Sequence, residues 1–192
     1  MLIYLHGFRS SPASVKSQHL RTRMAERGLQ DRLWSESLPV EPRLAIEKIE
    51  SAIRVAAKPP LLVGSSLGGY YATYLAQTHG LDAVLINPAA DAASLLKPWV
   101  GPHENLYTGE PFNLTDAHIE QLEGLWIPSL SHPERFWLLV ETGDEILDYR
   151  QAVRRYQGAR QTVIPGGDHG LQSFGDYVDE IIDLAIAEAR TN

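Results

Sequence analysis

Short apolar runs alternate along the chain with longer segments in which apolar residues recur at helical spacing. The apolar runs are too short for ordinary helices and predict buried strands. They lie at residues 2–5, 33–38, 61–63, 83–86, 136–140 and 161–164. The segments with helical spacing lie at about 12–28, 42–56, 67–79, 149–156 and 174–185. Because this alternation is typical of βαβ units, we expect an α/β fold, with a mostly parallel sheet of about six strands and helices on both faces.

The alternation stops between residue 91 and about residue 133. This stretch is rich in proline, glycine and aromatic residues and is longer than ordinary connections between helices and strands. Thr115 has the position of a helix cap, and Leu114 and Ile119 have the spacing of a hydrophobic staple, which predicts a short helix. No repeat or linker composition marks a second domain. We therefore expect residues 1–192 to form one domain, with a small lid inserted at about 91–133.

Composition and charge narrow the classes of partner and nucleophile. The chain carries 17 Lys and Arg against 24 Asp and Glu, a formal net charge of −7, which argues against nucleic acid as a partner. It has no cysteine, which excludes disulfide bonds, thiol nucleophiles and thiolate metal sites. Any nucleophile is therefore a serine, threonine, lysine or carboxylate.

Two segments of the sequence indicate where in the cell the protein is expected. The N-terminal apolar run ends at His6, well short of the core of a signal peptide, and it has no basic start. Residues 59–81 carry no Asp, Glu, Lys or Arg, but they include Pro59, Pro60, several glycines and His79. This composition favours a buried strand and a buried helix over a membrane span. We expect a cytoplasmic protein with no membrane span.

The strongest chemical signal is G-x-S-x-G, present as Gly64-Ser65-Ser66-Leu67-Gly68 between a predicted strand and a predicted helix. There the serine occupies a sharp turn at the carboxyl edge of the sheet, and the following helix N-terminus supplies free N–H groups and positive dipole. Ser66 is therefore the predicted nucleophile, and a turn that only packs is the alternative. Nucleotide-binding motifs and an H-E-x-x-H cluster are absent from the sequence, so we expect no cofactor and no metal.

A serine hydroxyl needs a general base, and the base needs a carboxylate that orients it. His169 follows the last predicted strand in the glycine-flanked loop Gly166-Gly167-Asp168-His169-Gly170, which suits an imidazole that reaches toward Ser66. The other histidines except His6 fall on predicted helices or in the lid, and we interpret them as surface residues. His169 is therefore the predicted base.

The acid is expected just beyond the strand at 136–140, where Glu141-Thr142-Gly143-Asp144-Glu145 offers three carboxylates. Asp144, directly after the glycine turn, is the favoured acid, and Glu145 is the alternative. The resulting order along the chain, Ser66 then Asp144 then His169, is that of the α/β-hydrolase fold. It differs from the orders of the chymotrypsin and subtilisin types.

The oxyanion formed during acyl transfer needs two hydrogen-bond donors. One is the backbone N–H of Leu67, which directly follows the nucleophile. The second must come from the loop after the first strand, and in His6-Gly7-Phe8 we assign it to the backbone N–H of Phe8. Taken alone, His6-Gly7-Phe8 is interpreted as a simple turn at a strand end.

The chain resembles the YqiA/YcfP-like group of small bacterial esterases, within the α/β-hydrolase superfamily, over nearly its full length. The resemblance rests on Tyr-Leu-His-Gly-Phe-Arg-Ser-Ser-Pro at 4–12, Gly-Ser-Ser-Leu-Gly-Gly-Tyr-Tyr-Ala at 64–72, Thr-Gly-Asp-Glu-Ile-Leu-Asp-Tyr at 142–149 and Gly-Gly-Asp-His-Gly at 166–170. It implies carboxylesterase activity on short acyl esters, extending to acyl-CoA thioesters. Because the strand at Leu2 opens the chain, we expect a minimal α/β-hydrolase fold without the first two strands of the full sheet.

Together these features predict a cofactor-free serine esterase of the carboxylesterase or thioesterase type, acting through an acyl-enzyme on a small acyl ester or thioester. A lactone would react by the same chemistry, and no residue indicates the oligomeric state. The alternative from another class is a non-catalytic small-molecule-binding protein on a hydrolase scaffold. Four aromatic residues of the lid are expected either to wall an acyl pocket or to pack the lid onto the sheet. They are Trp99, Tyr107, Phe112 and Trp126.

Overall fold

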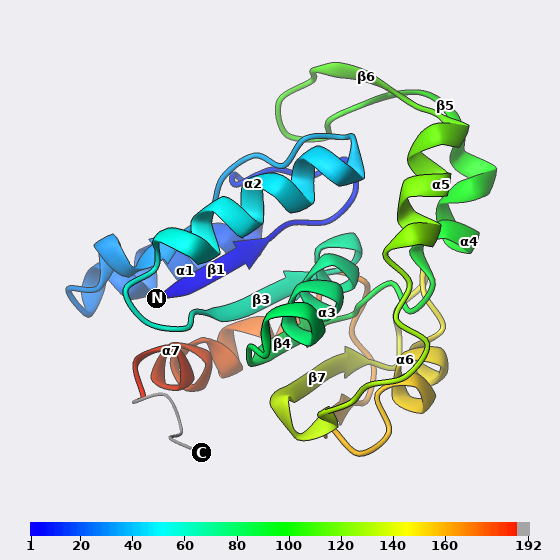
Figure 1. Cartoon of the computed structure of the whole chain (residues 1–192). Coiled ribbons are helices and arrows are strands. Elements are labelled where there is room, and N and C mark those ends of the chain that lie inside the picture. Colours follow the sequence, from blue (N-terminus) through cyan, green and yellow to red (C-terminus); the bar gives the residue numbers. More distant parts are fainter. Residues whose placement is uncertain (188–192) are drawn as a thin grey trace.

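The computed structural model describes residues 1–187 and is built around a six-stranded sheet (Figure 1). In spatial order the strands are β2 (Leu33–Trp34), β1 (Leu2–Leu5), β3 (Leu61–Ser65), β4 (Ala83–Ile86), β7 (Phe136–Glu141) and β8 (Arg160–Ile164). Every neighbouring pair in this sheet is parallel. The four central strands are buried at every position, which explains their continuous apolar runs. The predicted parallel sheet of about six strands is confirmed.

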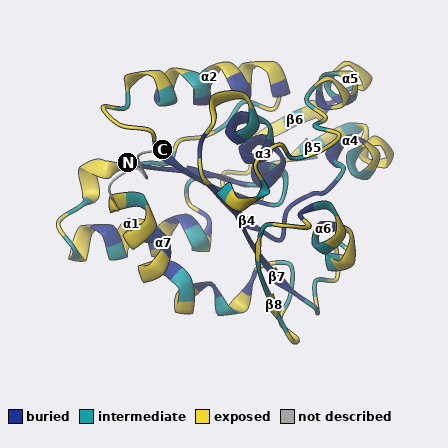
Figure 2. Cartoon of the chain, turned by 60° about the horizontal axis from the view of Figure 1, so that its bottom comes forward, coloured by how far each residue is buried: buried dark blue, intermediate teal, exposed yellow. Residues whose placement is uncertain are grey.

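Helices cover both faces of the sheet, as predicted. On one face lie α1 (Val15–Glu26) and α7 (Val178–Ile186), and on the other lie α2 (Pro42–Val55), α3 (Leu67–His79) and α6 (Tyr149–Arg155). Short 3₁₀ helices cover Gln30–Arg32, Lys97–Trp99, Pro133–Arg135 and Gln172–Tyr177. Figure 2 shows the buried strands between the two helical layers. No helix within residues 1–187 is long and apolar enough to cross a membrane.

The strand order places a topological switch between β1 and β3. From β1 the chain moves to β2 on one side, and all later strands are added on the other side. In an open parallel sheet, ligands bind at the carboxyl ends of the strands where the order reverses. The loops that follow β1 and β3 therefore flank the expected site.

The stretch predicted as a lid contains α4 (Ala92–Leu96), the antiparallel hairpin of β5 (Gly101–Glu104) and β6 (Pro111–Leu114), and α5 (Asp116–Gly124). Thr115 caps α5, and its hydroxyl accepts the N–H of His118 at 3.4 Å. Figure 1 shows these elements on the side of the sheet to which the carboxyl ends of the strands point. The insertion therefore lies beside the switch point.

Several boundaries differ from the prediction; the last helix, expected from residue 174, begins as α7 only at Val178, after the 3₁₀ helix Gln172–Tyr177. Two other differences have a cause in hydrogen bonding. The first helix begins at Val15, because residues 11–14 form a separate turn in which the N–H of Ser14 is bonded to the carbonyl of Ser11. The second strand stops at Trp34, and the chain beyond it turns so that the N–H of Leu38 is bonded to the ring of His6. Both differences arise from hydrogen bonds that apolar spacing does not reveal.

Candidate active site

Ser66 lies on the turn between β3 and α3, in a backbone conformation that side chains rarely adopt. Its φ of 55° and ψ of −119° fall outside the regions favoured by residues other than glycine. After the turn, α3 approaches β1 closely. This approach is possible because Gly68 has no side chain, since a Cβ there would collide with the carbonyl group of Leu5. The hydroxyl is thereby held at the carboxyl edge of the sheet, beside the switch point.

Asp144 and His169 lie in contact at the same edge. Nδ1 of His169 is 2.8 and 3.0 Å from the two carboxylate oxygens of Asp144, whose side chain is only 2% exposed. Asp144 is itself held by its Oδ1, which accepts the N–H groups of Ile146 and Leu147. Because a carboxylate only accepts, Nδ1 carries the proton in this pair and Nε2 is left as an acceptor.

Glu145, the alternative acid, has a different position. Its Oε2 accepts the backbone N–H of His169 at 3.0 Å. The two neighbouring carboxylates therefore both bind His169, Asp144 at the imidazole and Glu145 at the backbone N–H.

Asn87 connects the loops of Ser66 and His169. The N–H of Ser66 donates to Ile86 at the end of β4, and the next residue, Asn87, donates its Nδ2 to the carbonyls of Asp168 and His169, each at 3.1 Å. Within residues 1–187, no hydrogen bond joins the side chains of Ser66 and His169. The structure thus brings the acid and the histidine together and places the serine at the end of β3, which is separated from β7 by β4.

The loop after β1 packs directly against Ser66. A Cβ added at Gly7 would lie 3.1 Å from Cβ and 3.6 Å from Oγ of Ser66. Phe8 follows in this loop, and Leu67 is the first residue of α3. In the part of the chain that the structure describes, neither of their N–H groups donates to another protein group. Two backbone donors without an acceptor among the described residues therefore lie in the segments next to the serine.

His6 braces this loop. Its Nδ1 is 3.0 Å from the carbonyl of Gly7, and its Nε2 accepts the N–H of Leu38 at 3.0 Å. Burial lowers the pKa of His6 below its ordinary value, and the hydrogen bond to Gly7 opposes that shift only in part. A neutral ring satisfies both contacts, so His6 holds the turn as a structural group.

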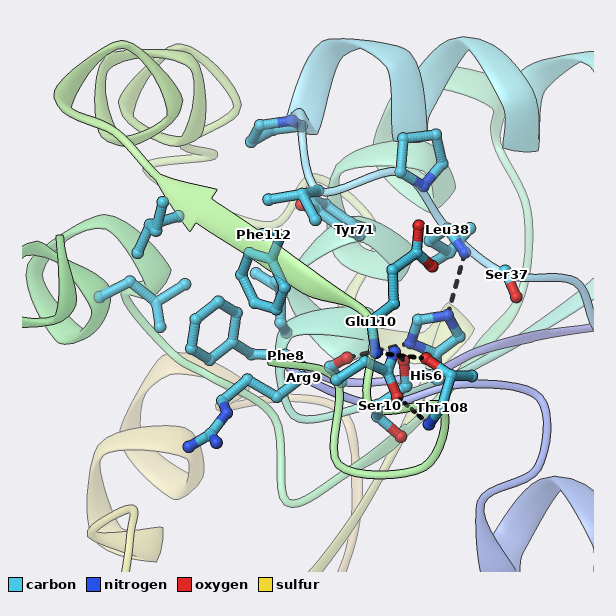
Figure 3. A pocket seen from close by; sticks show the side chains of 18 of the residues that line it. His6, Phe8, Arg9, Ser10, Ser37, Leu38, Tyr71, Thr108, Glu110 and Phe112 are labelled. Atoms are coloured by element: carbon cyan, nitrogen blue, oxygen red, sulfur yellow. Dashed lines mark hydrogen bonds between the residues drawn. The ribbon is translucent and has the colours of Figure 1, made fainter. Parts of the chain in front are cut away.

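A cavity of about 230 Å³, to whose lining Phe8 and Leu67 both contribute, lies next to the loop after β1 (Figure 3). Its apolar wall is formed by Phe8, Leu38, Leu67, Tyr71, Phe112, Leu114 and Leu122. Polar side chains, among them Ser37, Thr108 and Glu110, line another part of it. The cavity has the mixed, mostly apolar lining that is typical of small-molecule sites.

The four lid aromatics do not share one role. Phe112 lines the cavity and meets the ring of Phe8 edge to face at 5.7 Å. Trp99 packs edge-on against Phe8 at 6.5 Å, while Tyr107 is exposed near the hairpin turn. Trp126 lies under the guanidinium of Arg155 at 3.9 Å, away from the cavity. Only Phe112 of the four lines this cavity.

The hairpin is tied to the loop after β1 by several hydrogen bonds. Nε of Arg9 donates to the carbonyl of Glu104 at 3.0 Å, and the carbonyl of Arg9 accepts the N–H of Leu106 at 2.8 Å. Nδ2 of Asn105 donates to the carbonyl of Ser10 at 2.7 Å. The lid hairpin and the loop that carries the Phe8 N–H are therefore joined into one structural unit.

Among residues 1–187, no three His, Asp or Glu side chains gather in an arrangement that would hold a metal ion. The groups that lie at this edge of the sheet include the serine, the imidazole, the carboxylate and the two N–H groups.

Comparison with known proteins places the chain in a family. The model of the uncharacterised protein family (UPF0227) matches residues 1–186. The chain belongs to this family. The match covers every element of the sheet and every residue of the candidate site, and it agrees with the predicted YqiA-like resemblance.

Solved structures show how the fold is classified. A protein from Agrobacterium vitis is similar at a TM-score of 0.70 and 22% identity, over 96% of this chain and 87% of that chain. Mouse α/β hydrolase domain-containing protein 10 has a TM-score of 0.68 at 20% identity, over 95% of this chain and 88% of the mouse chain. A Paleococcus ferrophilus monoacylglycerol lipase has a TM-score of 0.67 at 16% identity, over 98% of this chain and 94% of the lipase chain. The predicted minimal α/β-hydrolase fold is confirmed.

Proposed function

We propose that the chain is a serine hydrolase that cleaves small carboxylic esters through an acyl-enzyme on Ser66. The observation that carries the proposal is the pairing of Asp144 with His169 at 2.8 Å, at the sheet edge where Ser66 occupies its φ of 55°. A binding site alone has no need of an imidazole that a carboxylate orients at the same sheet edge as a strained serine. Solved structures of this fold include esterases and lipases, which is consistent with the proposal.

The first half of the proposed reaction forms the acyl-enzyme. Nε2 of His169 takes the proton of the Ser66 hydroxyl as Oγ attacks the carbonyl carbon of the ester. Negative charge develops on the carbonyl oxygen, and the N–H groups of Phe8 and Leu67 stabilise it. The positive end of the α3 dipole adds to this stabilisation. The carbon–oxygen bond then breaks, and the alcohol leaves with the proton from His169.

The second half releases the acid. His169 takes a proton from water, the resulting hydroxide attacks the acyl carbon, and Ser66 regains its proton as the bond to Oγ breaks. Asp144 stays ionised throughout, where it keeps the imidazole oriented and stabilises its transient positive charge. A thioester or a lactone would pass through the same two halves.

The cavity beside the oxyanion donors is the proposed acyl site. Phe8 and Leu67, whose N–H groups are the proposed oxyanion donors, both line it, and Ser66 directly precedes Leu67. A volume of about 230 Å³ suits a short chain rather than a long one. Short acyl esters are therefore the proposed substrate class.

Replacement of the nucleophile tests the proposal. With p-nitrophenyl butyrate as substrate, Ser66→Ala should lower kcat by more than about 10³-fold, because the acyl-enzyme can no longer form. Circular dichroism should show a native fold, since the substitution removes only a hydroxyl group. Undiminished hydrolysis by the folded variant would refute the assignment.

A further inference from the structure

One buried carboxylate has no part in the proposed reaction. Glu141 is the last residue of β7, a strand buried at every position, and the residue is only 1% exposed. A buried carboxylate is costly unless hydrogen bonds replace its water. The groups that supply these bonds to Glu141 all belong to the loop of His169.

Four donors converge on this carboxylate. Oε2 accepts the backbone N–H groups of Asp168 at 2.8 Å and Gln172 at 2.9 Å. Oε1 accepts both the backbone N–H at 2.9 Å and the hydroxyl at 2.7 Å of Ser173. Residues 168–173 therefore curve around one side chain, and His169 is part of this curved segment.

The fit around Glu141 is close. A Cβ added at Gly167 would collide with its carboxylate, so the residue two positions before His169 has no room for a side chain. Asn87 holds the same loop from β4, since its Oδ1 accepts the N–H of Glu141 while its Nδ2 binds the carbonyls of Asp168 and His169. The ends of β4 and β7 thus fix the histidine loop together.

The carboxylate is ionised near neutral pH. Burial acts to raise the pKa of Glu141, but the hydrogen bonds from Ser173, Asp168 and Gln172 outweigh it and bring the pKa below its usual value. The other titratable groups in contact with this loop or beside it are Lys16 on α1, Asp144 and Glu145 after β7, and Asp168 and His169 after β8. Nζ of Lys16 donates to the carbonyl of Gly170 at 2.6 Å.

We propose that Glu141 is a positioning residue, whose carboxylate sets the shape of the histidine loop and so holds Nε2 of His169 in reach of Ser66. Glu141 acts through the loop and does not contact the substrate. The inference rests on the proposed serine hydrolase function.

Glu141→Gln is the direct test. An amide has one acceptor oxygen, so in either orientation its NH₂ group faces at least one backbone N–H of the loop. We expect kcat for p-nitrophenyl butyrate to fall by about 10²-fold, because small misplacements of a catalytic group have effects of this size. KM should change by less than about threefold, since the acyl cavity does not include Glu141.

The pH profile separates positioning from a loss of folded protein. Removal of a nearby negative charge disfavours the protonated base, so the acid limb of kcat/KM should move to lower pH by roughly half a unit. A smaller folded fraction would lower kcat/KM by the same factor at every pH and would leave the pH of the acid limb unchanged. Glu47→Gln, an exposed substitution on α2 far along the chain from the site, is the matched control and should behave as wild type.

Further variants make every outcome decisive. If Glu141→Gln does not fold, Ser173→Ala removes only the hydroxyl contact and should give a smaller fall in kcat, with KM nearly unchanged and with the acid limb in place, because the charge of Glu141 remains. Folded Glu141→Gln with the kcat and the acid limb of wild type would overturn the inference. An equal fall in kcat/KM at every pH, with no shift of the acid limb, would also overturn it. Loss of the proposed function itself is distinguishable, because wild type and Ser66→Ala would then hydrolyse the ester equally.

Discussion

At the scale of single residues, the site depends on how one backbone conformation and one pair of side chains are held. Ser66 has a φ of 55° at a turn where α3 packs so closely on β3 and β1 that Gly64 and Gly68 have no room for a Cβ. Within residues 1–187, Asp144 is the one side chain hydrogen-bonded to the imidazole of His169, since Glu145 binds only its main chain. Orientation of the imidazole is therefore assigned to a single carboxylate.

Amide substitutions of the two neighbouring acids should separate these roles. Asp144→Asn should lower kcat by about 10³- to 10⁴-fold, because an amide can force the wrong imidazole tautomer. Glu145→Gln should lower it by no more than about tenfold, as it disturbs one main-chain hydrogen bond. Steady-state kinetics on purified, folded variants measure both values. The reverse order would move the acid to Glu145.

At the scale of elements, the β5–β6 hairpin is a fixed part of the site. Asn105 binds the carbonyl of Ser10 through Nδ2 and accepts the N–H groups of Tyr107 and Thr108 through Oδ1. These bonds join the hairpin turn to the loop that carries the Phe8 N–H. We therefore expect the hairpin to stay in place during turnover.

Loss of this attachment should be measurable. Asn105→Ala should lower the free energy of unfolding by about 1–2 kcal/mol and speed hydrogen exchange at residues 104–111. Asn113→Ala is the matched control, because Asn113 is an exposed residue of β6 that does not line the cavity. Urea unfolding and exchange measured by mass spectrometry provide the comparison. Equal behaviour of the two variants would contradict the attachment.

The same hairpin should set the acyl length. Phe112→Ala enlarges the cavity at β6, so the preferred p-nitrophenyl ester should become longer by about two carbons or more. Leu106→Ala, at an exposed residue of the hairpin turn outside the cavity, should leave the preference unchanged. A series of kcat/KM values from acetate to decanoate measures this. An unchanged optimum in Phe112→Ala would place the acyl group elsewhere.

The elements of the sheet could be predicted because each strand is a continuous apolar run between helical segments. The hairpin could not be predicted, since Pro102 and Pro111 lie within it and neither apolar spacing nor alternation marks its strands. The positioning roles of Glu141 and Asn87 could not be predicted for another reason. Their partners lie 27 or more positions away in sequence, so only the folded chain shows what they bind. A carboxylate at the end of a buried strand was the one available signal for Glu141.

At the scale of the whole molecule, the order of the strands decides where chemistry can occur. The switch between β1 and β3 brings the loops of Phe8 and Ser66 together, and the neighbouring ends of β4 and β7 carry Asn87 and Glu141. The loop after β8 then reaches back across β7 to present His169. Segments distant in sequence therefore meet at one edge of the sheet.

Stability of the whole chain should fall on acidification. Burial lowers the pKa of His6 from 6.5 in the folded state, so the unfolded state binds its proton first and stability declines as pH falls below about that value. The lowered pKa of Glu141 adds a further decline below about 4.5. Urea unfolding from pH 8 to 4 should show both steps. His6→Gln should flatten the first step, and an unchanged slope would contradict this origin.

The most direct measurement is the intact mass of the protein after incubation with a fluorophosphonate, which reacts with activated serines. The account predicts a single adduct on the wild-type chain and none on Ser66→Ala, with both proteins folded. The absence of an adduct on folded wild-type protein, or an equal adduct on both, would contradict the central claim and favour a binding protein built on a hydrolase scaffold.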